Sequence, residues 1–91
     1  MYLSVQTALT IDSTAGGIAL TRPAGTQKAQ AQVFTAPVRY WMDGTAPTAT
    51  TGHRADVNDI IELGSAEEAL NFRAIRETSV SATLEITYYR A

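Results

Sequence analysis

The residues that could bind a metal ion are few in this chain of 91 residues. Acidic and amide side chains are concentrated in residues 56–59, and Glu67 follows further along the chain. A calcium loop of the EF-hand type requires an oxygen ligand at its fifth position and glycine at its sixth. Counted from Asp56, those positions hold Ile60 and Ile61, which a strand explains better. We therefore expect no calcium site here.

His53 is the only histidine, and the chain has no cysteine. Transition-metal sites usually need several nitrogen or sulfur ligands, so one histidine near Asp43, Asp56 or Asp59 is a poor candidate. The sequence has no Gly-x-Ser-x-Gly nucleophile elbow. The pair Gly16–Gly17 lacks the spacing of a phosphate-binding loop and is typical of a hairpin turn. We expect no catalytic residue and no cofactor, and we interpret His53 as a solvated loop residue.

Aromatic and arginine side chains are the remaining candidates for a binding surface. Alternation along residues 38–42 predicts that Tyr40 and Met42 point inward, whereas Arg39 and Trp41 point outward. Trp, Tyr and Arg are over-represented among the residues that contribute most to protein interfaces. Exposed aromatic side chains could instead stack on single-stranded bases or on sugars. We favour a protein interface. Its candidate residues are Arg39, Trp41, Asp43, Thr45, Pro47, Thr48, His53, Arg54 and Tyr89.

Two further arginines, Arg73 and Arg76, are close in sequence to Glu77 and precede Glu85 in an expected hairpin. We interpret them as partners in cross-strand ion pairs with these glutamates. Exposed pairs of this kind contribute only about 0–1 kcal/mol, so they do not indicate a site.

The composition argues against several classes of partner. Seven Lys and Arg residues face nine Asp and Glu residues, giving a formal net charge of −2. Binding to nucleic acid or to an anionic membrane favours a clustered basic excess, so we expect neither partner. No apolar run approaches the length of a membrane span. The first residues show neither the basic nor the apolar region of a signal peptide, and the absence of cysteine is compatible with a reducing cytoplasm.

Alternating apolar and polar residues predict the elements that must position these side chains. Residues 3–11, 28–33 and 80–90 alternate most clearly, and the last segment places Val80 and Leu84 on the inward face. Shorter strands are expected at residues 18–21, 37–42, 57–63 and 71–77, with a loop at residues 43–52.

The remaining signal is a capping box, in which Ser65 is followed by Glu68, and it predicts one helical turn at residues 66–70. Together the segments predict a single all-β domain over residues 1–91. We expect a small antiparallel β-sandwich or jelly-roll-like domain of seven or eight short strands, with one short helical turn near residues 65–70. The length of the chain fits one domain.

Several segments in their order resemble a class of small virion proteins from tailed bacteriophages. These segments are "RYWMDGTAPT", the later Gly52, "DIIEL", "SAEEALNFRAI" and the closing "ATLEITYYR". The resemblance covers residues 33–90, and the N-terminal third is similar only in its short Thr-rich strands. It implies a non-enzymatic β-sandwich protein with a structural role in the virion.

From the patterns and the resemblance together we expect a capsid decoration (cement) protein that binds and stabilises the capsid lattice as an oligomer. Its partners would be the major capsid protein or another virion protein, and further copies of itself in a dimer or trimer. It would be made in the bacterial host cytoplasm and reside on the capsid surface or in the head–tail region. The alternatives are a head–tail junction or tail structural protein, and a small β-module that binds single-stranded nucleic acid or carbohydrate.

Overall fold

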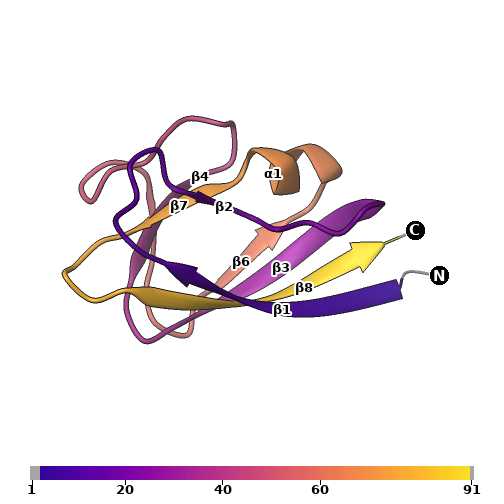
Figure 1. The fold of residues 1–91 in the computed structure, drawn as a ribbon, viewed down its shortest axis with the longest axis horizontal. Coiled ribbons are helices and arrows are strands. Elements are labelled where there is room, and N and C mark those ends of the chain that lie inside the picture. The colour runs from indigo at the N-terminus through magenta and orange to yellow at the C-terminus, as the bar shows by residue number, and fades with distance from the viewer. Residues whose placement is uncertain (1–2, 91) are drawn as a thin grey trace.

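The structure, a computed structural model, describes the backbone of residues 3–90 and the side chains of residues 6–90. Within this part of the chain, eight strands and one short helix follow one another (Figure 1). The elements are β1 (Leu3–Ile11), β2 (Ile18–Ala19), β3 (Thr26–Phe34), β4 (Val38–Trp41), β5 (His53–Ala55), β6 (Ile60–Leu63), α1 (Ala66–Asn71), β7 (Arg73–Arg76) and β8 (Ala82–Arg90).

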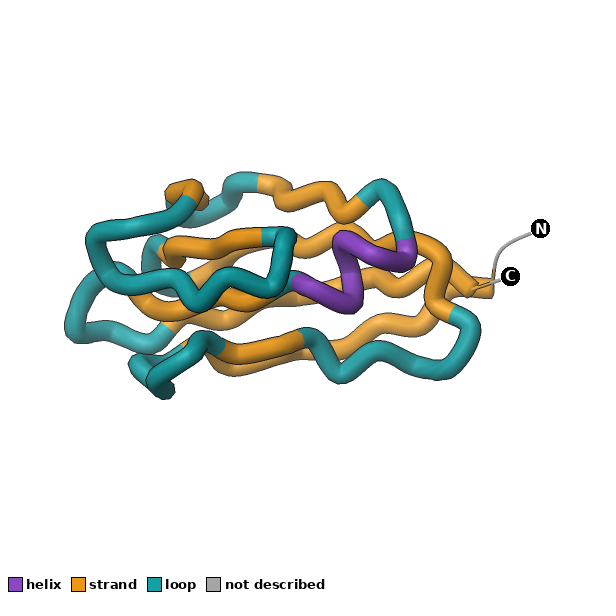
Figure 2. The backbone as a smooth tube through the Cα atoms, turned by 90° about the horizontal axis from the view of Figure 1, so that it is seen from above, coloured by secondary structure: helices purple, strands orange, loops and turns teal. Residues whose placement is uncertain are grey.

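The strands form two antiparallel sheets of four strands each. The first sheet has the order β1-β8-β3-β6, and the second has the order β2-β7-β4-β5. This arrangement confirms the expected all-β class and the single short helix. The strands run roughly along the long axis of the molecule (Figure 2).

The pairing of the strands is nested along the chain. The innermost pair is β4 with β5, and it is followed outward by β3 with β6, β2 with β7, and β1 with β8. The chain is therefore one long antiparallel hairpin whose tip is the loop between β4 and β5. Successive pairs belong alternately to the second and the first sheet. Two further pairings, β3 with β8 and β4 with β7, complete the sheets.

Inward-facing residues of both sheets bury one hydrophobic core. Alternate positions of β8, such as Leu84 and Tyr88, are fully buried, as the alternating pattern predicts. Alanines occupy inward positions on β3, where Ala29 and Ala31 leave room for larger neighbours. The second sheet contributes residues such as Val38 to the same cluster. The two sheets therefore face each other across a shared interior.

The short helix begins where the capping box predicts. The Ser65 hydroxyl accepts a hydrogen bond from the backbone N–H of Glu68 at 3.1 Å, which satisfies one of the free donors of the first turn. The Glu68 carboxylate in turn accepts from the backbone N–H of Gly64 at 2.8 Å. Ala69 is buried and the helix packs mainly against β3, so α1 covers one end of the core.

Three details differ from the sequence predictions. Val80, expected inside, is 51% exposed because it lies in the turn before β8, where its N–H donates to the Thr78 hydroxyl. The strand expected from residue 57 begins at Ile60, because Asn58 has a φ of 74° and donates its N–H to the Val33 carbonyl in a turn. His53, interpreted from the sequence as a loop residue, belongs to β5, a strand that was not predicted.

Candidate functional site

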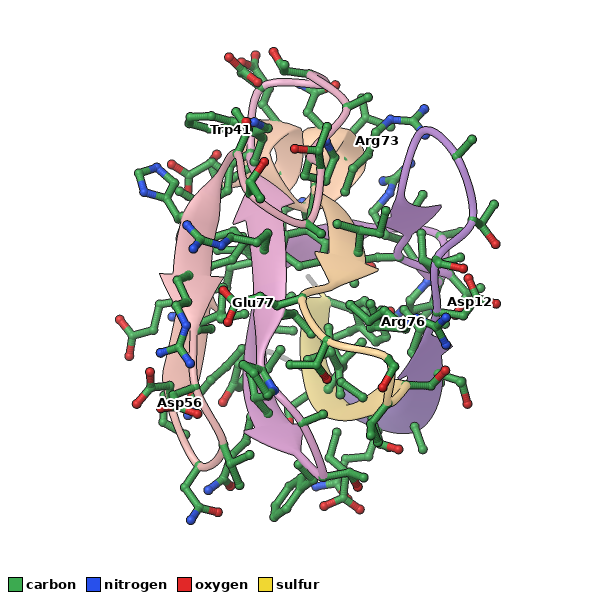
Figure 3. All side chains as sticks on the ribbon, turned by 90° about the vertical axis from the view of Figure 1, so that its left-hand side faces the viewer. Asp12, Trp41, Asp56, Arg73, Arg76 and Glu77 are labelled. Carbon is green, nitrogen blue, oxygen red and sulfur yellow. The ribbon has the colours of Figure 1, made fainter. Side chains whose placement is uncertain are left out.

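The candidate residues around Trp41 lie on and beside β4 and β5 of the second sheet. The strand register places Arg39 of β4 directly opposite Arg54 of β5. Arg39 and Trp41 alternate with Val38 and Tyr40, so they occupy the positions of β4 that face away from the core. Figure 3 views the molecule from this end, with Trp41 beside the loop that follows β4.

A carboxylate joins the two opposed arginines. The Glu77 side chain accepts from Arg39 Nε at 2.7 Å and from Arg54 Nε at 2.9 Å. Arg39 Nη1 also donates to the Gly52 carbonyl at 3.1 Å. Like charges directly opposite each other destabilise a strand pair, and Glu77 offsets that repulsion from the turn after β7. Hydrogen bonds from Arg54 and then Arg39 hold the pKa of Glu77 below its ordinary value of 4.5.

The prediction that Arg73 and Arg76 form ion pairs with Glu77 is wrong. That carboxylate pairs with arginines of β4 and β5 instead. Arg73 Nη1 donates to the Gly16 carbonyl and Arg76 Nη1 to the Ser81 hydroxyl, each at 3.4 Å. The residues nearest in sequence are not the nearest in space, because Glu77 follows the end of β7 and turns toward the β4–β5 side.

His53 and Trp41 form part of an aromatic cluster. The His53 ring lies 5.1 Å from the Trp41 ring, edge to face, and 5.5 Å from the Tyr40 ring. Tyr40 continues the contact to the buried Phe72 ring at 5.6 Å. His53 is exposed, as expected, but it is a packed strand residue and not an isolated loop side chain. The strand that contains His53 was not predicted, because three residues show no recognisable alternation.

Trp41 is only partly exposed, which refines the prediction that it points outward. Its indole Nε1 is shielded from solvent and has no hydrogen-bond partner within the described part of the chain. Buried indole N–H groups usually have a partner. Trp41 is therefore an exception among shielded indoles, and its ring packs edge to face against the His53 ring while remaining partly exposed.

The loop between β4 and β5 is held by its own backbone. The backbone N–H of Thr45 donates to the Asp43 carboxylate at 3.0 Å, and hydrogen bonds from Thr45 lower the pKa of Asp43. Thr48 and Thr51 pair through both of their backbone groups. Gly44 donates its N–H to the Asn71 carbonyl at the end of α1. Asp43, Thr45 and Thr48 are exposed on this ordered loop.

Pro47, another candidate interface residue, is buried in the folded molecule. It packs where two glycines leave space: a Cβ on Gly17 would lie 3.1 Å from Pro47 Cδ, and one on Gly52 would lie 3.5 Å from Pro47 Cβ. Its ring fixes the loop to the rest of the second sheet and is not available to a partner. We therefore remove Pro47 from the candidate surface.

Tyr89 lies on the other sheet. It alternates with the buried Tyr88 on β8, so it faces away from the core on the first sheet, while Trp41 faces away on the second. The Lys28 ammonium is 5.2 Å from the centre of the Tyr89 ring. The predicted set of residues is therefore divided between two surfaces. We name the residues on the second sheet the Trp41 surface: Arg39, Trp41, Asp43, Thr45, Thr48 and Arg54, with His53 at its margin. The register places His53 opposite Tyr40, on the other side of the strand pair from Arg39 and Arg54.

The outward face of the first sheet carries a shallow hollow that the sequence analysis did not single out. Its volume is about 550 Å³. Glutamine, threonine and tyrosine side chains from β1, β3 and β8 line much of it; they include Gln6, Gln30, Gln32, Thr87 and Tyr89. We name this the glutamine face. The alternation of Gln and Thr with buried residues was visible in the sequence, but the lateral order of the strands that gathers them was not.

Residues 56–59 act as a turn. The Asp59 carboxylate accepts from the backbone N–H of Asp56 at 2.8 Å, and Asp56 accepts from the N–H of Val57. Over residues 3–90, no three His, Cys, Asp or Glu side chains are grouped so that they could hold a metal ion. No helix of this part of the chain is long and apolar enough to cross a membrane.

Comparison of the chain with protein-family models, with curated proteins and with solved structures finds no match.

Proposed function

We propose that the two sheets form a jelly roll, a β-sandwich of eight strands in which a long antiparallel hairpin is rolled into two four-stranded sheets. Three observations support this proposal. The strands number eight in the described part of the chain, their pairing is nested from β4–β5 outward, and successive pairs alternate between the sheets. The orders β1-β8-β3-β6 and β2-β7-β4-β5 follow from rolling such a hairpin.

We propose that the protein is a non-enzymatic structural component of a bacteriophage virion, and that it decorates and stabilises the capsid lattice. The nested strand order carries this proposal, because jelly rolls are a common architecture of viral capsid proteins. The resemblance of residues 33–90 to small virion proteins of tailed phages supports it independently. A position at the head–tail junction or in the tail is the main alternative.

The Trp41 surface supplies the contact with the capsid in this proposal. It combines a partly exposed indole with two arginines that both pair with Glu77. Such residues dominate the energetics of protein interfaces. A capsid presents the same site many times, so several copies in one oligomer bind more tightly together than singly. A weak contact at each Trp41 surface would then be sufficient to hold the oligomer on the shell.

The direct experiment is co-sedimentation of the purified protein with capsid shells assembled from the major capsid protein of the same phage. We expect saturable binding, and we expect Trp41→Ala to weaken it by at least about tenfold, the range of an interface hot spot. Tyr89→Ala is the matched control, because it removes an aromatic ring from the opposite sheet. Thr48→Arg tests the same surface at an exposed loop position without disturbing the aromatic cluster.

One result would contradict the capsid assignment, and a second would contradict the role of the Trp41 surface in it. The first is the absence of binding to the shells together with binding to isolated tails, which favours the tail alternative. The second is an equal loss of binding for Trp41→Ala and Tyr89→Ala, with Thr48→Arg unaffected. That result would separate capsid binding from the Trp41 surface.

A further inference from the structure

The two sheets have four edge strands, and three of them are short. β2 has two residues, β5 has three and β6 has four. The fourth edge strand, β1, has nine. Edge strands expose unpaired backbone N–H and C=O groups, and natural proteins commonly keep them short to prevent pairing with other chains. β1 is the exception in this molecule.

Charge also protects two of the short edges, but not β1. β5 carries Arg54 and β6 carries Glu62, whereas the sequence of β1, "LSVQTALTI", has no charged residue, no proline and no glycine. Its register with β8 is continuous over all nine residues, from Leu3 opposite Arg90 to Ile11 opposite Ala82. No bulge therefore twists this edge away. Within residues 3–90, no strand covers its other side.

We propose that β1 pairs antiparallel with β1 of a second copy, so that two first sheets join into one continuous sheet of eight strands. This inference deepens the proposed function, because it rests on the oligomeric role and names the contact that forms the oligomer. The resulting dimer has a two-fold axis through the β1 pair, as expected of an isologous interface.

The sequence of β1 is suited to pairing with itself. In a register centred on Thr7, Thr7 lies opposite its equivalent and Gln6 lies opposite Ala8. Odd-numbered residues then lie opposite odd-numbered residues, and even-numbered opposite even-numbered. The core-facing positions of the two copies are therefore on one side of the joined sheet, and the solvent-facing positions are on the other. No like charges meet at any of the nine positions, since none of them is charged.

The charges nearest to β1 do not oppose this arrangement. Asp12 follows one end of β1, and Arg90 of β8 lies opposite Leu3 at the other end, where its Nε donates to the Ala24 carbonyl at 2.9 Å. Antiparallel pairing brings the Asp12 end of each copy to the Arg90 end of the second copy, so these like charges are kept apart. Gln6 also lines the glutamine face, so the two glutamine faces adjoin across the dimer.

The test adds like charges to the edge without weakening the single chain. In the double variant Gln6→Lys, Ala8→Lys, lysines of the two copies lie opposite each other. Inside one chain, position 8 is opposite Glu85, so the new lysine gains an ion-pair partner there. Gln32→Lys is the matched control: position 32 is also opposite Glu85, on the same face, but on the interior strand β3.

Sedimentation velocity over a range of concentrations measures self-association in the absence of capsids. We expect a dimer for the unaltered chain, an increase of at least about tenfold in its Kd for the double variant, and little change for Gln32→Lys. A chain that remains monomeric up to about 1 mM would overturn the inference. A double variant that dimerises as tightly as the control would also overturn it. A third contrary result is that the β1 edge pairs with a strand of another virion protein and never with a second copy of this chain.

A second measurement uses the absence of cysteine from the chain. Thr7→Cys places two thiols across the two-fold axis, so mild oxidation should cross-link the dimer, whereas Thr10→Cys should not. Efficient cross-linking of Thr10→Cys alone would contradict the register. Because both measurements omit capsids, a dimer that fails to bind shells refutes the proposed function alone, and a monomer that binds shells refutes this inference alone.

Discussion

Among single residues, Glu77 has the clearest structural task. It lies after β7 and accepts hydrogen bonds from Arg39 of β4 and Arg54 of β5. It thereby connects the turn that leads into β8 with two strands that would otherwise place guanidinium groups opposite each other. Both arginines of the Trp41 surface donate to this carboxylate; Arg39 also donates to the Gly52 carbonyl, and Arg54 to the Asp56 carboxylate.

The ionisation of Glu77 should make stability depend on pH. Its pKa is lower in the folded chain than its ordinary value of 4.5, so it stabilises the fold above that pH. The stabilisation is lost as the pH falls through the lowered folded value. We expect Glu77→Gln to lower Tm by a few degrees, about 2–5 °C, at pH 7, and we expect this difference in Tm to shrink as the pH falls below 4.5.

Thermal unfolding followed by circular dichroism over this pH range measures the difference in Tm between the two proteins. Glu85→Gln is the control, because Glu85 lies on the exposed face of β8 and has no ion pair with Arg39 or Arg54. A difference in Tm between the unaltered chain and Glu77→Gln that is constant with pH would show that the carboxylate charge is not what stabilises this region.

The prediction of individual residues succeeded where local alternation decides orientation. Arg39 was expected to face away from the core, and it does. The partners of Arg39 could not be predicted, because Glu77 and Gly52 reach it only through the folding of the second sheet. The burial of Pro47 escaped prediction for the same reason, since it depends on Gly17, which is distant in sequence.

At the level of elements, long strands with regular alternation were predicted well. β3 and β8 bury alternate residues as expected, and the capping box located α1. β5 was missed because three residues contain little more than one period of a strand. The ends of elements depend on turns, and the turn at Asn58 could not be recognised from composition alone.

The two halves of the expected segment 80–90 should respond differently to mutation. Leu84 is fully buried at the centre of β8, so Leu84→Ala should cost about 3 kcal/mol through lost burial and a cavity. Val80 lies in the exposed turn, so Val80→Ala should change stability by no more than about 0.5 kcal/mol. Urea unfolding monitored by Tyr and Trp fluorescence gives both values. Equal losses would place Val80 in the core after all.

For the whole molecule, the fold class could be predicted but the strand order could not. Alternation and turn residues indicate strands, and their number suggested two packed sheets. Neither property indicates that β1 pairs with β8, because this contact joins segments at opposite ends of the described chain. The same limitation explains why the candidate site was predicted as one surface. Trp41 and Tyr89 were grouped by residue type, but the structure places them on different sheets.

Nested pairing also predicts slow folding. Most sheet contacts join segments distant in sequence, and domains rich in such contacts fold in milliseconds to seconds. We expect refolding after dilution from urea to be in that range, measured by stopped-flow fluorescence of Trp41. Refolding in microseconds, as for small helical bundles, would contradict the claim that formation of the nested strand pairs limits the rate of folding.

The position of β8 has a consequence for biosynthesis. This strand lies between β1 and β3 in the first sheet, yet it is the last of the described strands to leave the ribosome. Translation proceeds at about 5–20 residues per second, so β1 waits several seconds for its partner. During that interval an uncharged nine-residue strand is exposed on every nascent chain. Both β1–β1 pairing and aggregation would therefore begin between the β1 strands of neighbouring nascent chains on one polysome.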